Sequence, residues 1–128
     1  MPIEFGFEAN GSDQDRFHDV DKVVMRHAFD IHNTLGRFCD ERIYHEEMVW
    51  RCRASGFRAE KEFPIRITIN DSTKIYYLDM LVEESFIYEL KTVEELNATH
   101  EKQLINYLLL TDLNHGKLLN FRPPSVQT

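Results

Sequence analysis

The chain has 128 residues, 42% hydrophobic and 29% charged, which is enough for one domain with a buried core and ordinary for a globular protein. Its net charge of −7 argues against a protein that coats nucleic acid through surface charge, but not against an enzyme that reaches phosphates through a bound cation. No apolar run approaches the roughly 20 residues of a membrane helix, and the N-terminus lacks a secretory signal. Cys39 and Cys52 have no metal-ligand spacing, so we expect a reduced, cytoplasmic protein that does not bind membranes.

The first residues combine glycine and polar side chains without any period, so we expect a loose leader over residues 1–14 and a single domain over residues 15–128. Apolar residues then recur at helical spacing until the pattern breaks near Gly36, and a second helical pattern ends at Ser55-Gly56. Apolar and alternating runs between turn residues predict strands after that point. The predicted helices cover residues 15–35, 39–54 and 94–111, and the predicted strands cover residues 62–70, 74–82, 86–93 and 117–121.

The lengths of the connections predict how the strands pair. The first three strands are joined by short turns, so they can only form an antiparallel meander. The helix before the last strand is long enough for a crossover, which makes that strand parallel to its neighbour. The expected fold is therefore α/β of the α+β kind, with a central mixed sheet flanked by helices in the order helix, helix, three strands, helix, strand.

One strand, FIYELKTV (residues 86–93), carries Glu89 and Lys91 among apolar residues. Burying a charge costs several kcal/mol unless it is paired or bound to metal, so these two residues need a reason to be there. If the preceding hairpin is centred near Glu84, Asp79 lies opposite Glu89, with Cβ atoms roughly 4.5–5.5 Å apart. Lys91 is two residues beyond Glu89 and shares its face of the sheet. Two acids and an amine are thus predicted to converge.

This arrangement suits the hydrolysis of a phosphodiester. Asp79 and Glu89 can hold Mg²⁺, which prefers oxygen ligands and keeps several waters. Such an ion activates a water molecule and neutralises charge on the phosphate, while Lys91 can stabilise the nucleophile or the transition state. From spacing alone, the competing interpretation is a solvated aspartate beside a Glu89–Lys91 pair at a sheet edge.

The pattern of Asp79 followed by Glu89-Leu90-Lys91 resembles the PD-(D/E)XK nuclease superfamily, and the chain from about Val20 to Phe121 more narrowly resembles the bacterial GxxExxY proteins within it. Two positions depart from these patterns: Phe38 stands where the narrower family has its name-giving glycine, and Leu78 stands where the superfamily has a proline. The matching runs are LGRFCDERIYHEEM (35–48), YLDMLVE (77–83), FIYELKTV (86–93), HEKQLINYLLLT (100–111) and KLLNF (117–121).

The resemblance implies a restriction-endonuclease-like core and roles for further residues. Glu41 would be a helix carboxylate that faces the metal site and acts in catalysis. Gln103 and Tyr107, which share a helix face, would lie beside the site and support it. His100 lies on that face too, although a lone helix histidine is more often a surface or capping group. The implied ligands of Mg²⁺ or Mn²⁺ are Asp79, Glu89, Glu41 and the backbone carbonyl of Leu90.

We therefore expect a metal-dependent nuclease whose catalytic residues are Asp79, Glu89, Lys91 and Glu41 and whose partner is DNA or RNA. A small domain with so little basic surface is also a candidate homodimer. The alternative from a different class is a non-catalytic α/β interaction module that keeps the nuclease-like fold. The acidic net charge favours the module, whereas the complete set of four catalytic side chains favours the enzyme.

Overall fold

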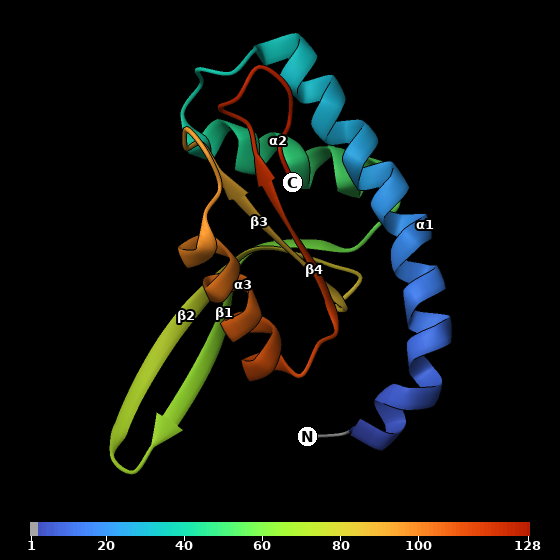
Figure 1. Ribbon diagram of the computed structural model, residues 1–128, viewed down its shortest axis with the longest axis vertical. Coiled ribbons are helices and arrows are strands. Elements are labelled where there is room, and N and C mark those ends of the chain that lie inside the picture. The colour runs from blue at the N-terminus through green and yellow to red at the C-terminus, as the bar shows by residue number, and fades with distance from the viewer. Residues whose placement is uncertain (1–2) are drawn as a thin grey trace.

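The computed structural model describes residues 3–128, with side chains from residue 13 onward. Its described residues form three helices and four strands in the predicted order (Figure 1). The α+β fold predicted from the sequence is thereby confirmed. The elements are α1 (Ile3–Leu35), α2 (Glu41–Ala54), β1 (Ala59–Ile69), β2 (Ser72–Val82), β3 (Phe86–Lys91), α3 (Ala98–Thr111) and β4 (His115–Asn120).

The N-terminal segment differs from the prediction. Helix α1 begins at Ile3, so residues 3–14 form its first turns instead of a loose leader. A helix gains one backbone hydrogen bond for each residue added once it is nucleated, so the packed part of α1 can extend through a polar segment that has no apolar period of its own. Residues 1 and 2 of the expected leader lie outside the described residues. A single domain over residues 15–128 remains a prediction.

Helix α3 begins at Ala98, four residues later than predicted. Asn97 is the N-cap that sets this start, because its side-chain oxygen accepts hydrogen bonds from the backbone N–H groups of Thr99 and His100. His100 returns the contact: its Nδ1 accepts the Asn97 N–H at 3.0 Å, which completes a capping box. The capping interpretation of His100 is therefore the one that the structure supports.

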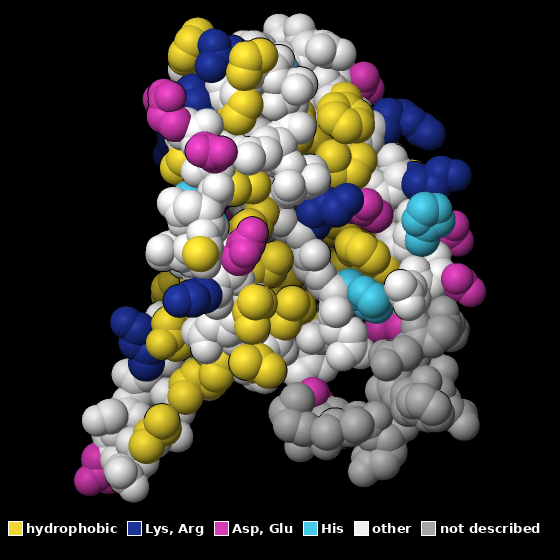
Figure 2. All heavy atoms as spheres, viewed as in Figure 1, with side chains coloured by type: hydrophobic (Ala, Val, Ile, Leu, Met, Phe, Trp, Pro, Cys, Tyr) yellow, Lys and Arg dark blue, Asp and Glu magenta, His cyan; other side chains and the backbone are white. Residues whose placement is uncertain are grey.

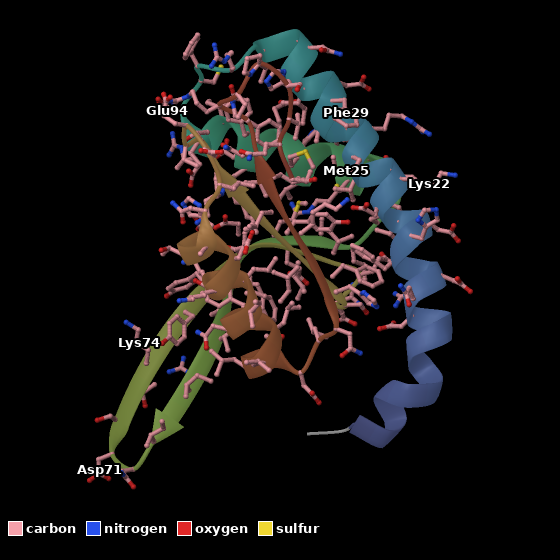
Figure 3. The ribbon with its side chains drawn as sticks, viewed as in Figure 1. Lys22, Met25, Phe29, Asp71, Lys74 and Glu94 are labelled. Carbon is pink, nitrogen blue, oxygen red and sulfur yellow. The ribbon has the colours of Figure 1, made fainter. Side chains whose placement is uncertain are left out.

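The sheet has the order β1-β2-β3-β4. Strands β1 to β3 pair antiparallel, and β4 pairs parallel to β3 after the crossover through α3, as predicted. The β1–β2 hairpin is long and extends beyond the other elements, with Asp71 at its tip (Figures 1 and 3). The β2–β3 ladder is much shorter, because it runs only from Val82↔Phe86 to Met80↔Tyr88.

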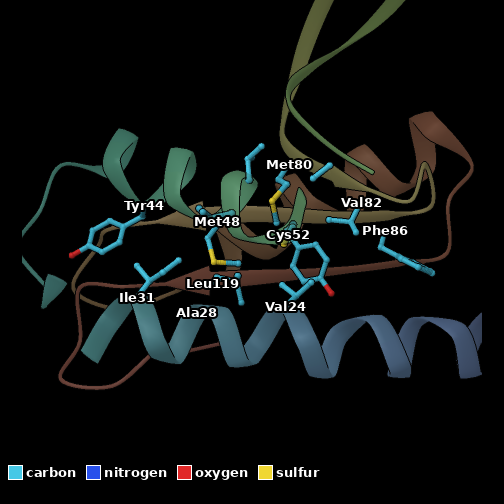
Figure 4. Packing of buried hydrophobic residues seen from close by; sticks show 14 of the residues in the cluster. Val24, Ala28, Ile31, Tyr44, Met48, Cys52, Met80, Val82, Phe86 and Leu119 are labelled. Carbon is cyan, nitrogen blue, oxygen red and sulfur yellow. The ribbon is translucent and has the colours of Figure 1, made fainter. Parts of the chain in front are cut away.

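The two faces of the sheet are covered by different helices. Helices α1 and α2 pack on one face, where Ile31, Tyr44 and Met48 meet Tyr88 and other strand residues (Figure 4). Helix α3 covers the other face through Tyr107 and its partly buried leucines. Because successive strand residues alternate between the two faces of a sheet, every second side chain of β3 enters the larger core and the others face α3.

Two partly buried sets of polar contacts attach distant segments to β3 and to the chain that follows it. Asp21 of α1 accepts hydrogen bonds from the Tyr88 hydroxyl at 2.8 Å and the Lys117 ammonium at 2.6 Å. At the other end of the strand, the fully buried Asn120 exchanges hydrogen bonds with the backbone of Val93. The segment that follows β3 is thus held in place.

Hydrophobic side chains are also exposed along the hairpin and over α3 (Figure 2). The most exposed of the large ones there are Ile69, Tyr77, Ile105 and Leu109. Within residues 3–128, no helix combines the length and the apolar character needed to cross a membrane.

The close packing of β3, β4 and α3 at Gly116 generates a stability prediction. A Cβ at this position would lie 2.9 Å from both the Ile87 carbonyl oxygen and Leu104 Cδ1. Gly116→Ala should therefore lower the free energy of unfolding by about 1–3 kcal/mol, as overpacking does. Urea unfolding measures this, with Ser72→Ala at an exposed strand position as the control. Equal stability of Gly116→Ala and the wild type would show that β4 can move to accommodate the added methyl group without lowering the free energy of unfolding.

Candidate active site

The β2–β3 ladder ends where two carboxylates take over its hydrogen bonds. Beyond Met80↔Tyr88, the Asp79 N–H donates to Glu89 Oε2 at 2.9 Å, and the Leu90 N–H donates to Asp79 Oδ2 at 2.8 Å. Each acid thus accepts a backbone hydrogen bond from the opposite strand. The structure therefore brings Asp79 and Glu89 together, as the predicted hairpin register requires.

A local distortion of β1 lies beside this pair. The β1–β2 ladder passes from Lys61↔Met80 to Phe63↔Leu78 without a pair between Glu62 and Asp79. Glu62 has a φ of 51°, in the left-handed region that L-residues rarely adopt. Strained backbone of this kind is often found beside functional sites. Here it accompanies the point at which Asp79 leaves the regular ladder and turns its carboxylate to β3.

Burial and mutual repulsion make this a pair of weak acids. Glu89 is only 2% exposed to solvent. Burial, and then the negative charge of Asp79, raise the pKa of Glu89 to about 8. Burial also raises the pKa of Asp79, although His45 and the Leu90 N–H oppose that change. A cation between the two carboxylates would relieve the repulsion that helps to raise the pKa of Glu89.

Lys91 is held beside the carboxylates by helix α3. Its ammonium donates to Gln103 Oε1 at 2.9 Å, and Gln103 Nε2 donates to the Tyr107 hydroxyl at 3.3 Å. The pKa of Tyr107 is raised by burial and then by the charges of Glu89 and Asp79, which places its hydroxyl in their field. The structure thus brings Gln103 and Tyr107 to the site, as the resemblance implies.

Helix α2 contributes Glu41 and a residue that the sequence analysis missed. Glu41 Oε1 accepts the Thr92 hydroxyl at 3.4 Å, so it reaches the end of β3. His45 follows one turn later, and its Nε2 lies 3.4 Å from Glu41 Oε2 and 3.7 Å from Asp79 Oδ2. The i,i+4 spacing from Glu41 was the only signal in the sequence that could have revealed it.

His45 is a buried ring among acceptors. Burial lowers the pKa of His45, but Glu41, Asp79 and a hydrogen bond to the Leu90 backbone outweigh it and raise the pKa. A backbone bond that favours the charged ring runs from a ring N–H to the carbonyl oxygen. Within the described part of the chain, Nε2 is buried and makes no hydrogen bond of good geometry.

Tyr44 fixes the start of α2 and therefore the position of Glu41. Its hydroxyl donates to the Gly36 carbonyl at 2.6 Å and accepts the Cys39 N–H at 3.2 Å. Its ring stacks on Phe121, with centroids 4.5 Å apart. In the same loop Phe38 is 73% exposed, so a bulky side chain is accommodated where the GxxExxY pattern has glycine.

The residues present fit a magnesium-like ion, although they form no complete cage. Among the described residues, no group of three or more His, Cys, Asp or Glu side chains is arranged to hold a metal. Mg²⁺ needs no such group, because it is commonly bound by one or two carboxylates and keeps several waters. Asp79, Glu89 and the Leu90 carbonyl offer only oxygen ligands. Lys91 is an ammonium and is not a ligand.

Comparison with known proteins agrees with this geometry. A model of the PD-(D/E)XK nuclease superfamily matches residues 18–128. Nucleases of this superfamily generally depend on divalent metal ions. No curated protein and no solved structure matches the chain. The match is to the superfamily, so the narrower GxxExxY assignment remains a prediction.

The raised pKa of Glu89 generates a pH prediction. Because the folded-state pKa of about 8 exceeds the usual 4.5, the folded state binds this proton more tightly than the unfolded state. Stability without metal should therefore fall as the pH rises from 4.5 to 8, by up to about 1.4 kcal/mol per pH unit. Glu89→Gln should remove most of this slope, because its amide oxygen can still accept the Asp79 N–H.

The measurement is urea unfolding at several pH values in the presence of a chelator. Glu47→Gln, on the partly exposed outer part of α2, is a control with the same change of charge. If the wild type and Glu89→Gln show parallel stability profiles, Glu89 is ionised without penalty in the folded protein.

Proposed function

We propose that this chain, which belongs to the PD-(D/E)XK nuclease superfamily, is a divalent-metal-dependent nuclease that hydrolyses a phosphodiester bond of DNA or RNA. The observation that carries the proposal is the reciprocal hydrogen bonding of Asp79 and Glu89, with Lys91 on the same strand as Glu89. A purely structural pair has no reason to bury two mutually repelling carboxylates at the end of a ladder.

Asp79, Glu89 and the Leu90 carbonyl are the groups that would hold Mg²⁺ or Mn²⁺. A divalent ion bound there supplies an activated water molecule and neutralises charge on the phosphate. The protein's contribution is to keep both carboxylates in place before any ion arrives. The two backbone N–H groups do so, since each fixes one carboxylate oxygen.

Lys91 supplies the fixed positive charge. A preorganised donor stabilises charge that develops in the transition state without having to reorient during the reaction. Gln103 accepts one ammonium hydrogen of Lys91 and is itself bonded to Tyr107, so the amine is directed by the rigid helix α3. Glu41 adds a further acid from α2. We propose Gln103 and Tyr107 as residues that position Lys91.

The alternative remains an interaction module without catalysis. The net charge of −7 and the exposed side chains of the hairpin favour it over a protein that binds nucleic acid through a broad basic surface. Metal binding separates the two. An intact site gains thermal stability with Mn²⁺ by mass action, and Asp79→Asn should abolish that gain. Homodimer formation and a cytoplasmic location are further predictions.

Lys91→Ala should lower single-turnover cleavage by about 10²–10³-fold, because one preorganised electrostatic donor is lost. Mn²⁺ affinity should survive, since Lys91 is not a ligand. Binding of nucleic acid in Ca²⁺ should weaken only modestly, because one phosphate contact among several is removed. The assay uses mixed DNA and RNA substrates with Mg²⁺ or Mn²⁺.

Lys102→Ala, an exposed position on α3, is the matched control and should retain cleavage. Wild-type cleavage that persists undiminished in both Lys91→Ala and Glu89→Ala would place the activity elsewhere. No Mn²⁺ stabilisation of the wild type, together with strong destabilisation by Asp79→Asn, would favour the interaction module.

A further inference from the structure

His45 contacts three of the four groups that the sequence resemblance implies as metal ligands. Its Nε2 faces Glu41 Oε2 at 3.4 Å and Asp79 Oδ2 at 3.7 Å. Its ring also hydrogen-bonds the backbone of Leu90. His45, to which the sequence analysis assigned no role, therefore lies among the expected ligands.

The His45 ring contacts both of the carboxylates that an ion shared by Glu41 and Asp79 would have to bridge. Metal–oxygen bonds are about 2.0–2.2 Å long for Mg²⁺ and similar ions, so a shared ion needs both carboxylates close to one point. Here both carboxylates are turned to Nε2 of the same imidazole. The side chain of His45 is only 14% exposed, and it extends from α2 to Asp79 of β2. It is therefore packed in place.

We propose that the His45 ring occupies the place of a second metal ion, so that Glu41 is withdrawn from the ligand set and the site binds one divalent ion through Asp79 and Glu89. This inference rests on the proposed function, because it concerns the same site. It replaces the implied role of Glu41 as a ligand by a different one: Glu41 holds the His45 ring against Asp79.

Removal of the ring should restore a second ion site. In His45→Ala, Glu41 and Asp79 would face each other with no imidazole ring between them. Two facing carboxylates bind a cation or a proton to relieve their repulsion. Both side chains are accessible to solvent, at 45% and 22%, so an ion can reach them.

The test is an equilibrium Mn²⁺ titration that counts bound ions by the electron paramagnetic resonance of the free ion. The wild type should bind one ion per chain and His45→Ala two. The double variant Glu41→Gln/His45→Ala should bind one again, because the second site has lost a carboxylate. The control is His27→Ala, because His27 of α1 hydrogen-bonds Ser55 at the C-terminal end of α2, away from the carboxylates. It should bind one ion.

Glu41→Gln alone keeps the proposal testable even if His45→Ala does not fold. Loss of a ligand or of its hydrogen-bonded partner typically lowers metal affinity by about 10–100-fold, whereas we expect a change in Mn²⁺ Kd of less than about threefold. A loss of tenfold or more would make Glu41 a ligand and overturn the proposal. Circular dichroism of each variant checks the fold.

Other outcomes separate this inference from the proposed function. Two ions bound by the wild type, or one ion bound by a folded His45→Ala, would overturn the role of His45 and leave the nuclease proposal standing. Weaker binding of the first ion by His45→Ala would identify the ring as a ligand and would also overturn it. No Mn²⁺ bound by the wild type would overturn both.

Discussion

The site depends on one interaction, the exchange of backbone hydrogen bonds between Asp79 and Glu89 across the end of the β2–β3 ladder. A regular ladder would pair backbone with backbone at this level and leave the side chains free to move. Here the carboxylates replace that pairing, so the strands can separate while both acids stay fixed. The distortion at Glu62 on the neighbouring strand accompanies the separation. Fold and site are thus joined through the same two bonds.

The surrounding elements hold β3 in a way that preserves this arrangement. Strand β4 pairs with it over its whole length, from Phe86↔His115 to Lys91↔Asn120. Asn120 then fixes the segment after Lys91, and Phe121 supports Tyr44 at the start of α2. The last strand therefore positions both the lysine end of β3 and the helix that carries Glu41 and His45. Figure 3 shows this region near Glu94, where the chain leaves β3 beside α2.

Local sequence patterns predicted most of the fold, because the position of a turn and the alternation along a strand depend on residues that are close in the sequence. The turn centred on Glu84 gives Val82↔Phe86, and the same register brings Asp79 to Glu89. Alternation along β3 separates Glu89 from the apolar core residues. The start of α3 was missed because Asn97 competes for the backbone through its side chain. His45 could not be assigned, since its importance depends on how closely α2 approaches β2, and no sequence period encodes that distance.

On the proposed role of His45, the packing around its ring gives a reason for one ion and not two. Glu41 and Asp79 both face Nε2 of this imidazole, at 3.4 and 3.7 Å. A second ion shared by these two carboxylates would have to displace a side chain that is only 14% exposed. It would also bring a further charge into a partly buried space, where the desolvation of each charge is costly. The imidazole is a group that the fold already contains at this point, so Glu41 stays engaged without a second ion.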